Sequence, residues 1–289
     1  MPKNAVQLGR FLKEKTAILS KSRAESPYLH CLLVLSKVVG KPKEYLIAHP
    51  ELELSIEQVQ AFSLYFERLL KGEPLAYITG EKEFWNLRFL CSNVALIPRP
   101  ETELMVEKAL ALTKSQRVRY LVDLGTGTGA IGITLASIWK DTRVILTDIS
   151  LEALFLARRN CVRILGDTTR VSLVCCSWLE GFHPDFKAEV ITVNPPYVSK
   201  GERDLLQESV RRFEPEKALF AKDESGLSEI KRIFRQAVHH LTKNGIVLCE
   251  IGAGQAQDAV SFIRQLKVYE EVQVFKDLAG TDRVIAARL

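Results

Sequence analysis

The sequence predicts an α/β protein with a parallel sheet, preceded by a small all-helical domain. From Arg119 onward, short apolar runs alternate with segments of helical periodicity. These runs lack two-fold alternation, which is expected of strands that are covered on both faces. Before about Lys71, apolar residues recur only at three- and four-residue steps. We therefore expect two parts of different fold class.

The N-terminal part carries several helix-end signals. Ser26-Pro27 fits an N-cap followed by proline at the first helical position, and this helix should stop at Gly40. Ser55 and Gln58 have the spacing of a capping box. We assign residues 1–75 to a helical domain, which serves either as packing support or in recognition of a partner.

The pattern changes over residues 76–100, which we interpret as a linker. Apolar residues stand among short polar breaks there, and Asn93 lies near an expected turn, so the segment predicts a β-hairpin. The main domain is expected over residues 101–289 and should open with a helix from Glu101 to Thr113.

Within the main domain, apolar runs place the strands and helical periodicity places the helices between them. Strands are expected at Tyr120–Leu124, Val144–Thr147, Val171–Cys176, Val190–Val193 and Ile246–Ile251, with terminal additions at Val272–Phe275 and Val284–Ala287. Helices are expected at Ile131–Ile138, Leu151–Ile164 and Leu227–Leu241.

The composition is typical of a globular protein. Of the 289 residues, 47% are hydrophobic and 26% are charged, which suffices for a substantial core. The net charge of +5 is spread without a long basic run, so it is not a nucleic-acid signature. The six cysteines lack metal-binding spacing, and we expect reduced thiols and no metal. Met1–Arg10 has no signal-peptide core and no apolar run could span a bilayer, so we expect a cytoplasmic protein.

A glycine-rich turn follows the first predicted strand. Its alternate glycines let the backbone bend tightly and approach a ligand closely, so a nucleotide-like ligand belongs here. The expected cofactor residues are Asp123, Gly125, Thr126, Gly127, Thr128 and Gly129. The glycines also satisfy the dinucleotide fingerprint through Gly132, which leaves a nicotinamide or flavin enzyme open. Because Asp123 can receive the α-ammonium of S-adenosylmethionine, directly or through water, it favours that cofactor over an anionic pyrophosphate.

A second acidic residue ends the next strand. Asp148 should accept hydrogen bonds from the ribose hydroxyls of the cofactor. The alternative is an N-cap for the following helix, but Ser150 can perform that task.

The tetrapeptide Asn194-Pro195-Pro196-Tyr197 comes directly after the predicted strand Val190–Val193, at the edge where open α/β sheets bind ligands. The two prolines hold a rigid, extended corner. The side-chain oxygen of Asn194 and the carbonyl of Pro195 can accept both hydrogens of a substrate –NH2 group. Tyr197 can lie against the planar group and exclude water.

The tetrapeptide therefore predicts methyl transfer to a planar amide or amine nitrogen, with Asn194, Pro195 and Tyr197 as the catalytic positions and Pro196 as a further substrate contact. In-line displacement at the sulfonium-activated methyl needs positioning more than a strong base. The alternative is a rigid turn without chemistry, since asparagine and proline are common turn residues.

With these motifs in place, the sequence resembles the peptide-chain-release-factor glutamine methyltransferases, the PrmC or HemK family, over nearly its whole length. The tetrapeptide is shared with adenine-N6 and guanine-N2 methyltransferases of nucleic acid, so other segments carry the distinction. These are Pro74–Gly80, Leu96–Glu103, Phe213–Phe220, Glu250–Gly252 with Gln255, and Asp277–Arg283.

The resemblance implies a class I, Rossmann-like fold with a mostly parallel seven-stranded sheet, a helical N-terminal domain and a linking β-hairpin. It implies transfer of a methyl group from S-adenosyl-L-methionine to N5 of the glutamine in the Gly-Gly-Gln motif of release factors, leaving S-adenosyl-L-homocysteine. It also implies cofactor contacts at Trp178 and Asn194. Ser177 departs from the family, where an acidic residue often precedes this tryptophan, and this departure puts a hydrogen bond to the adenine in doubt.

Four hypotheses thus stand: a protein-glutamine methyltransferase, a nucleic-acid amino-methyltransferase, a non-catalytic translation factor that binds the cofactor, and a dinucleotide oxidoreductase. We expect the first, as a monomer whose partners are bacterial-type class 1 release factors, without a membrane or direct nucleic-acid partner.

Overall fold

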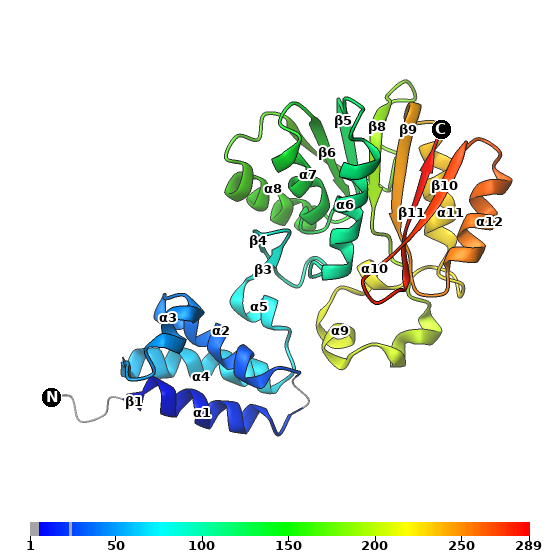
Figure 1. The fold of residues 1–289 in the computed structure, drawn as a ribbon. Helices are drawn as coiled ribbons and strands as arrows, with labels where there is room; N and C mark the ends of the chain where they lie inside the picture. Colours follow the sequence, from blue (N-terminus) through cyan, green and yellow to red (C-terminus); the bar gives the residue numbers. More distant parts are fainter. Residues whose placement is uncertain (1–5, 23–24) are drawn as a thin grey trace. The chain divides into compact units, whose positions relative to one another are not determined.

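The computed structural model describes residues 6–22 and 25–289, so the first five positions of the predicted N-terminal domain lie outside the described residues. The chain divides into two compact units. The helical unit comprises the chain up to Gly80 together with Gln207–Phe213 (Figure 1). The sheet unit comprises Glu81–Leu206 and Glu214–Leu289. The predicted domain boundaries at residues 75 and 100 stay a prediction.

The helical unit is built mainly of short helices around an apolar core. Its elements are β1 Val6–Gln7, α1 Leu8–Leu19, α2 Pro27–Val39, α3 Lys43–Ala48, β2 Glu53–Leu54, α4 Ile56–Leu70, α5 Leu75–Thr79 and α9 Glu208–Phe213. The two-residue strands β1 and β2 pair antiparallel, a feature that the sequence did not predict. The core includes Phe11 and Phe62, whose rings meet edge to face at 5.0 Å.

The helix-end predictions for this unit are confirmed with one exception. The Ser55 hydroxyl accepts from the Gln58 backbone N–H, and the Gln58 side chain accepts from the Ser55 backbone, which completes the capping box of α4. Gly40 ends α2 in the left-handed conformation. Ser26 precedes Pro27 as expected, but its side chain makes no capping hydrogen bond.

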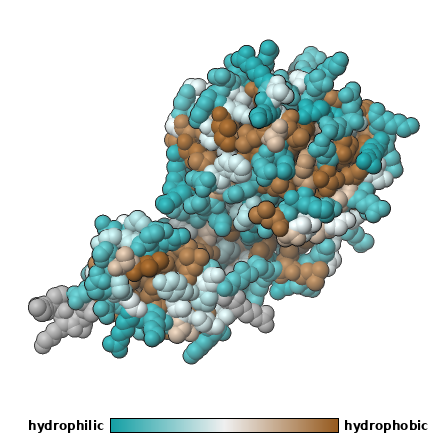
Figure 2. Space-filling model, viewed as in Figure 1, coloured by the Kyte–Doolittle hydropathy of each residue, from teal (hydrophilic) through white to brown (hydrophobic). Residues whose placement is uncertain are grey.

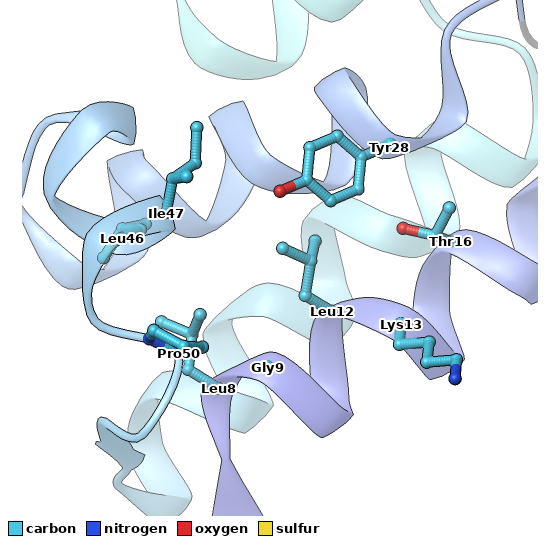
Figure 3. Close-up of a pocket in the computed structure, with 9 residues that line it drawn as sticks. All are labelled: Leu8, Gly9, Leu12, Lys13, Thr16, Tyr28, Leu46, Ile47 and Pro50. Carbon is cyan, nitrogen blue, oxygen red and sulfur yellow. The ribbon is translucent and has the colours of Figure 1, made fainter.

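A shallow pocket of about 220 Å³ lies on the helical unit (Figure 3). Most of its lining is apolar, with Lys13 and Thr16 on α1 and Tyr28 on α2 at its rim. On the face shown in Figure 2, hydrophilic surface is interrupted by separate apolar patches. Among the described residues, the helices are all too short or too polar to cross a bilayer.

The sheet unit opens with the predicted hairpin, formed by β3 Glu81–Phe84 and β4 Leu87–Leu90. Its turn is Trp85–Asn86, where both residues have positive φ as a type I′ turn requires. The Glu103 carboxylate accepts from the Trp85 backbone N–H at 2.8 Å and so stabilises this turn. Asn93, which the sequence placed near the hairpin turn, lies in a separate turn after β4.

The rest of the sheet unit alternates strands and helices. Its elements are η1 Pro100–Thr102, α6 Glu103–Leu112, β5 Tyr120–Leu124, α7 Ala130–Ile138, β6 Arg143–Asp148, α8 Leu151–Leu165, β7 Val171–Cys175, β8 Ala188–Val193, η2 Lys200–Leu205, α10 Glu216–Leu219, α11 Ser228–Ala237, β9 Leu241–Glu250, α12 Ala256–Gln265, β10 Glu271–Lys276 and β11 Asp282–Arg288. The seven-stranded sheet has the order β10-β11-β9-β8-β5-β6-β7, and only β11 runs antiparallel to its neighbours.

Each face of the sheet packs against its own helices. Alternate residues of β5 point to opposite faces, so that Leu121 joins the core beneath α6, α7 and α8 while Val122 joins the core beneath α11 and α12 (Figure 1). The mostly parallel sheet covered on both faces is therefore confirmed. The edge strands β7 and β10 are less covered, as the exposed Cys175 on β7 shows.

One predicted helix was too long. The apolar pattern placed a helix over Leu227–Leu241, but α11 ends at Ala237 and Leu241 already pairs with Ala188 in the sheet. The carbonyl of His240 accepts from the Ala188 N–H at 2.9 Å. Backbone groups committed to the sheet cannot also continue the helix.

Candidate active site

The candidate site lies where the strand order reverses. Strand β5 is flanked by β6 on one side and β8 on the other, and open α/β sheets bind ligands in a crevice at the carboxyl ends of strands at such a switch point. The pairing of Leu124 with Val193 sets Gly125 and Asn194, the next residue of each chain segment, on neighbouring strands about 4.8 Å apart. The glycine loop and the tetrapeptide therefore meet at one edge.

The Asp123 carboxylate holds the glycine loop from below. Its Oδ2 accepts from the Thr126 hydroxyl at 2.5 Å and from the Gly132 N–H at 3.2 Å, and its Oδ1 accepts from the Thr192 hydroxyl at 2.8 Å. The residue is 1% exposed, and burial raises the pKa of its carboxyl to about 6. Three donors of the chain thus already bind this carboxylate, and its predicted contact with the cofactor ammonium, directly or through water, stays a prediction.

The glycines adopt the backbone conformations that the turn needs. Gly125, Gly127 and Gly129 all have positive φ, between 55° and 84°. A Cβ on Gly129 would lie 2.4 Å from a methyl of Ile133, so this position excludes larger residues on two grounds. The Thr126 N–H donates to the carbonyl of Thr147 at 2.8 Å, which ties the loop to the end of β6.

Asp148, the last residue of β6, lies beside the loop. Its carboxylate accepts from the backbone N–H groups of Gly127 at 3.0 Å and Ser150 at 2.9 Å. Burial raises its pKa. The cap of α8 is Ser150, whose hydroxyl accepts from Ala153, so the alternative of an N-cap role for Asp148 is not realised.

Trp178 stands next to Gly125 in a backbone conformation that bulky side chains rarely adopt, with φ of 51°. A Cβ on Gly125 would lie 3.2 Å from its ring, so the missing side chain of the glycine makes room for the indole. The indole N–H donates to the Glu229 carboxylate at 2.5 Å. Glu229 is 4% exposed and lies 3.3 Å from the Lys222 ammonium. No local motif marks Glu229, which lies 51 positions away on α11.

The tetrapeptide follows β8 directly. The Asn194 side-chain amide donates to the Thr102 hydroxyl at 3.4 Å, and the Tyr197 hydroxyl donates to the Glu250 carboxylate at 3.2 Å. Pro195 is buried, whereas Pro196 is partly exposed. Burial, together with the Glu250 charge, raises the pKa of Tyr197 far above its usual range. The phenol therefore stays protonated, which fits shape and packing rather than proton transfer.

Two further contacts brace the tetrapeptide. The Gln255 amide donates to the carbonyls of Tyr197 at 3.0 Å and Ser225 at 3.2 Å, and its oxygen accepts from the Gly252 N–H. Gly226 has φ of 71°, and a Cβ there would lie 2.2 Å from the Tyr197 carbonyl oxygen. In the sequence alone, Gln255 stands out only as part of a segment that resembles the family.

An ion pair closes one side of the site. The Arg99 guanidinium lies 2.5 Å from the Glu214 carboxylate, whose other oxygen accepts from the Ile97 N–H at 3.2 Å. The Glu214 side chain is 1% exposed. The predicted segments Leu96–Glu103 and Phe213–Phe220 are thereby joined, although 115 positions separate the paired residues.

Comparisons with known proteins agree along the chain. A family described as the PrmC N-terminal domain matches residues 11–80, and one described as the methyltransferase small domain matches residues 101–220. The release factor glutamine methyltransferase of Vibrio cholerae is 38% identical over 281 residues, which cover 97% of this chain and 96% of that protein. The protein of the same name from Escherichia coli is 36% identical, over 95% of this chain and 96% of its own.

Among solved structures, the hMettl16 catalytic domain in complex with MAT2A 3'UTR hairpin 6 has a TM-score of 0.55 at 16% identity. That likeness covers 80% of this chain and 81% of the other, and it shows a methyltransferase fold alone. The fold, the crevice at the switch point and the full-length likeness to the bacterial relatives lead to one conclusion: the chain belongs to the release factor glutamine methyltransferase family.

Proposed function

We propose that this protein transfers a methyl group from S-adenosyl-L-methionine to the side-chain amide nitrogen N5 of the glutamine in the Gly-Gly-Gln motif of peptide chain release factors. The observation that carries this proposal is the meeting of the glycine loop after β5 with Asn194–Tyr197 after β8 at the switch point of the sheet. The names of the full-length relatives supply the substrate class.

The residues around the crevice suit S-adenosyl-L-methionine. Gly125, Gly127 and Gly129 have positive φ and give the loop a tight turn, and we assign this loop, with Thr126 and Thr128, to cofactor binding. We assign the ribose to Asp148, whose carboxylate remains partly exposed, and one face of the adenine to Trp178. Asp123 then supports the cofactor by fixing the loop through the three donors that it accepts.

The bound cofactor would supply a methyl group activated by a sulfonium. The side chain oxygen of Asn194 and the Pro195 carbonyl would accept the two hydrogens of the substrate amide and hold its nitrogen toward that methyl. Transfer would join this methyl to the substrate nitrogen and leave S-adenosyl-L-homocysteine, and the nitrogen would lose one proton to water. Orientation of this kind can contribute several kcal/mol to lowering the barrier, about 7–11 kcal/mol in the best cases. Tyr197 and Pro196 would exclude water beside the amide.

Purified bacterial class 1 release factor, incubated with the protein and labelled S-adenosyl-L-methionine, tests the proposal. Mass spectrometry should locate one added methyl on the Gly-Gly-Gln glutamine, and a release factor with alanine at that position should gain none. Absence of label on wild-type factor, or preferential labelling of adenine or guanine in DNA or ribosomal RNA, would overturn it.

We further infer a monomer that acts in the cytoplasm, because that is where release factors meet ribosomes. Gel filtration coupled to light scattering, with and without the release factor, tests the assembly state.

A further inference from the structure

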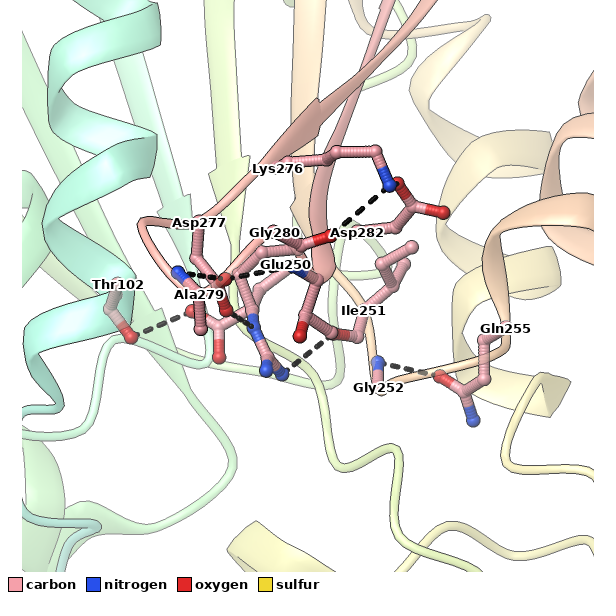
Figure 4. Close-up of polar contacts among 12 residues, drawn as sticks. Thr102, Glu250, Ile251, Gly252, Gln255, Lys276, Asp277, Ala279, Gly280 and Asp282 are labelled. Atoms are coloured by element: carbon pink, nitrogen blue, oxygen red, sulfur yellow. Dashed lines mark hydrogen bonds and ion pairs between the residues drawn. The ribbon is translucent and has the colours of Figure 1, made fainter.

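Glu250, the last residue of β9, links two residues of the candidate site from beneath. Its Oε2 accepts from the Thr102 hydroxyl at 2.6 Å, and its Oε1 accepts from the Tyr197 hydroxyl at 3.2 Å. Figure 4 shows the first of these contacts, with Glu250 reaching from the sheet toward Thr102. Glu250 is 1% exposed, so water cannot replace either partner at low cost.

The chemistry of these groups fixes the direction of each hydrogen bond. Each oxygen of the Glu250 carboxyl group accepts from one hydroxyl, so the single hydroxyl hydrogen of Thr102 points to Glu250. The Thr102 oxygen then has only lone pairs left for Asn194, and it accepts from Nδ2 at 3.4 Å. With Nδ2 turned inward, the other end of the Asn194 amide, Oδ1, is left to face the substrate side.

The surrounding charges keep this carboxylate in its place. The positive charge of Arg283 opposes the rise in the Glu250 pKa that burial causes, whereas the negative charge of Glu101 adds to that rise. Arg283 is itself held by the Asp277 carboxylate at 3.3 Å and by the carbonyl of Ile251 at 3.3 Å. The hydrogen bonds from Thr102 and Tyr197 thus fix the position of the Glu250 carboxyl group.

We infer that Glu250 is a positioning residue which, through Thr102, sets which end of the Asn194 amide faces the substrate, and which holds the Tyr197 ring through its hydroxyl. The inference rests on the proposed function, since an outward Oδ1 matters only if the substrate presents an –NH2 group. If the amide were reversed, the –NH2 group of Asn194 would face the –NH2 group of the substrate. Both are hydrogen-bond donors, so the substrate nitrogen would lose an acceptor.

The test compares Thr102→Val, which removes the hydroxyl at nearly constant volume, with Thr102→Ser, which keeps it. Thr102→Val should lower kcat for release factor methylation by about tenfold or more, the range for a lost hydrogen bond to a charged group. KM for the release factor and Kd for S-adenosylhomocysteine should stay within about twofold of wild type, since neither ligand is lost. Thr102→Ser should restore kcat to within about threefold of wild type.

Thr113→Val is a matched control, because Thr113 is equally buried but its hydroxyl donates to the Ala109 carbonyl at the end of α6. It should leave kcat unchanged. Glu250→Gln supplies a double-mutant cycle with Thr102→Val, in which the combined loss should be well below the product of the single losses. Tyr197→Phe tests the second arm separately and should lower kcat by about twofold to tenfold.

The possible failures are distinct. No methylation of the release factor by wild type would remove the proposed function itself. If the wild type is active, three results would overturn the role of Glu250. These are an unchanged kcat in Thr102→Val, a loss of kcat in Thr102→Ser as large as that in Thr102→Val, or losses in Glu250→Gln and Thr102→Val that multiply in the double variant. If thermal unfolding shows that Thr102→Val does not fold, a double-mutant cycle of Tyr197→Phe with Glu250→Gln takes its place. Losses of kcat that multiply in that double variant would likewise overturn the role of Glu250.

Discussion

Two buried carboxylates, Asp123 and Glu250, support opposite sides of the crevice. Each is 1% exposed and each accepts from threonine hydroxyls. Asp123 also accepts from a backbone N–H, and two of its three donors lie within nine positions of it along the chain. The donors to Glu250 are 148 and 53 positions away. Asp123 therefore shapes a local loop, whereas Glu250 joins segments that only the tertiary fold brings together.

The largest expected effect lies on the Glu250 side, at the residue that it orients. Asn194→Ala removes the acceptor that directs the substrate amide, and kcat should fall by about 10²–10³, the range for loss of one preorganised group. Binding of S-adenosylhomocysteine, followed by calorimetry, should change little by comparison. A variant that keeps most of its turnover would show that the tetrapeptide is only a rigid turn.

Asp123 should make the free energy of unfolding depend on pH. The pKa of its carboxyl is about 6 in the folded protein, against about 3.9 when unfolded. The folded state therefore binds more protons between these values, and the free energy of unfolding falls as pH rises from about 4 to about 6. The effect reaches at most about 3 kcal/mol.

Urea unfolding of the wild type and of Asp123→Asn at several pH values isolates this contribution. As the pH falls, the free energy of unfolding of the wild type should rise relative to that of Asp123→Asn, because only the wild type can neutralise its buried charge by protonation. A difference that is constant across the window would show that Asp123 titrates normally.

Gly132→Ala would add a side chain on α7 that is too close to Asp123. The new Cβ would lie 2.4 Å from a methyl of Leu146 and 2.9 Å from the Asp123 Cβ. Overpacking of this kind should lower the free energy of unfolding by about 1–3 kcal/mol, although alanine has the better helix propensity. Gly201→Ala is the control, since its nearest neighbour is Ser199 Oγ at 3.9 Å. Equal stability of the two variants would contradict a tightly packed loop.

The smallest effect is expected at Trp178, a loop residue that donates a hydrogen bond to the distant Glu229. Trp178→Phe keeps an aromatic face but removes the donor to Glu229. Affinity for S-adenosylhomocysteine should fall by about twofold to tenfold, as for the loss of one hydrogen bond. An unchanged Kd in isothermal titration would mean that the hydrogen bond to Glu229 does not contribute to cofactor binding.

Local signals accounted for much of this molecule. The capping box at Ser55, the left-handed Gly40 and the strand Tyr120–Leu124 followed from neighbouring residues, because hydrogen bonds and side-chain spacing within a few positions determine them. The hairpin was also predicted, but its turn was misplaced. Trp85 is an unusual residue for a left-handed turn, and the distant Glu103 stabilises it there.

By itself, then, the sequence determined the α/β class, the glycine loop and the tetrapeptide at a strand end, since each is written in contiguous residues. Only the tertiary structure decided that Glu250 supports Asn194 through Thr102, that Glu229 anchors Trp178 and that Arg99 pairs with Glu214. The physical reason is the packing of strands, helices and loops around one edge of the sheet. That packing brings Glu250 on β9, Glu229 on α11 and Glu214 before α10 to residues far away in the sequence, and no periodicity or local motif encodes which donor each carboxylate will meet.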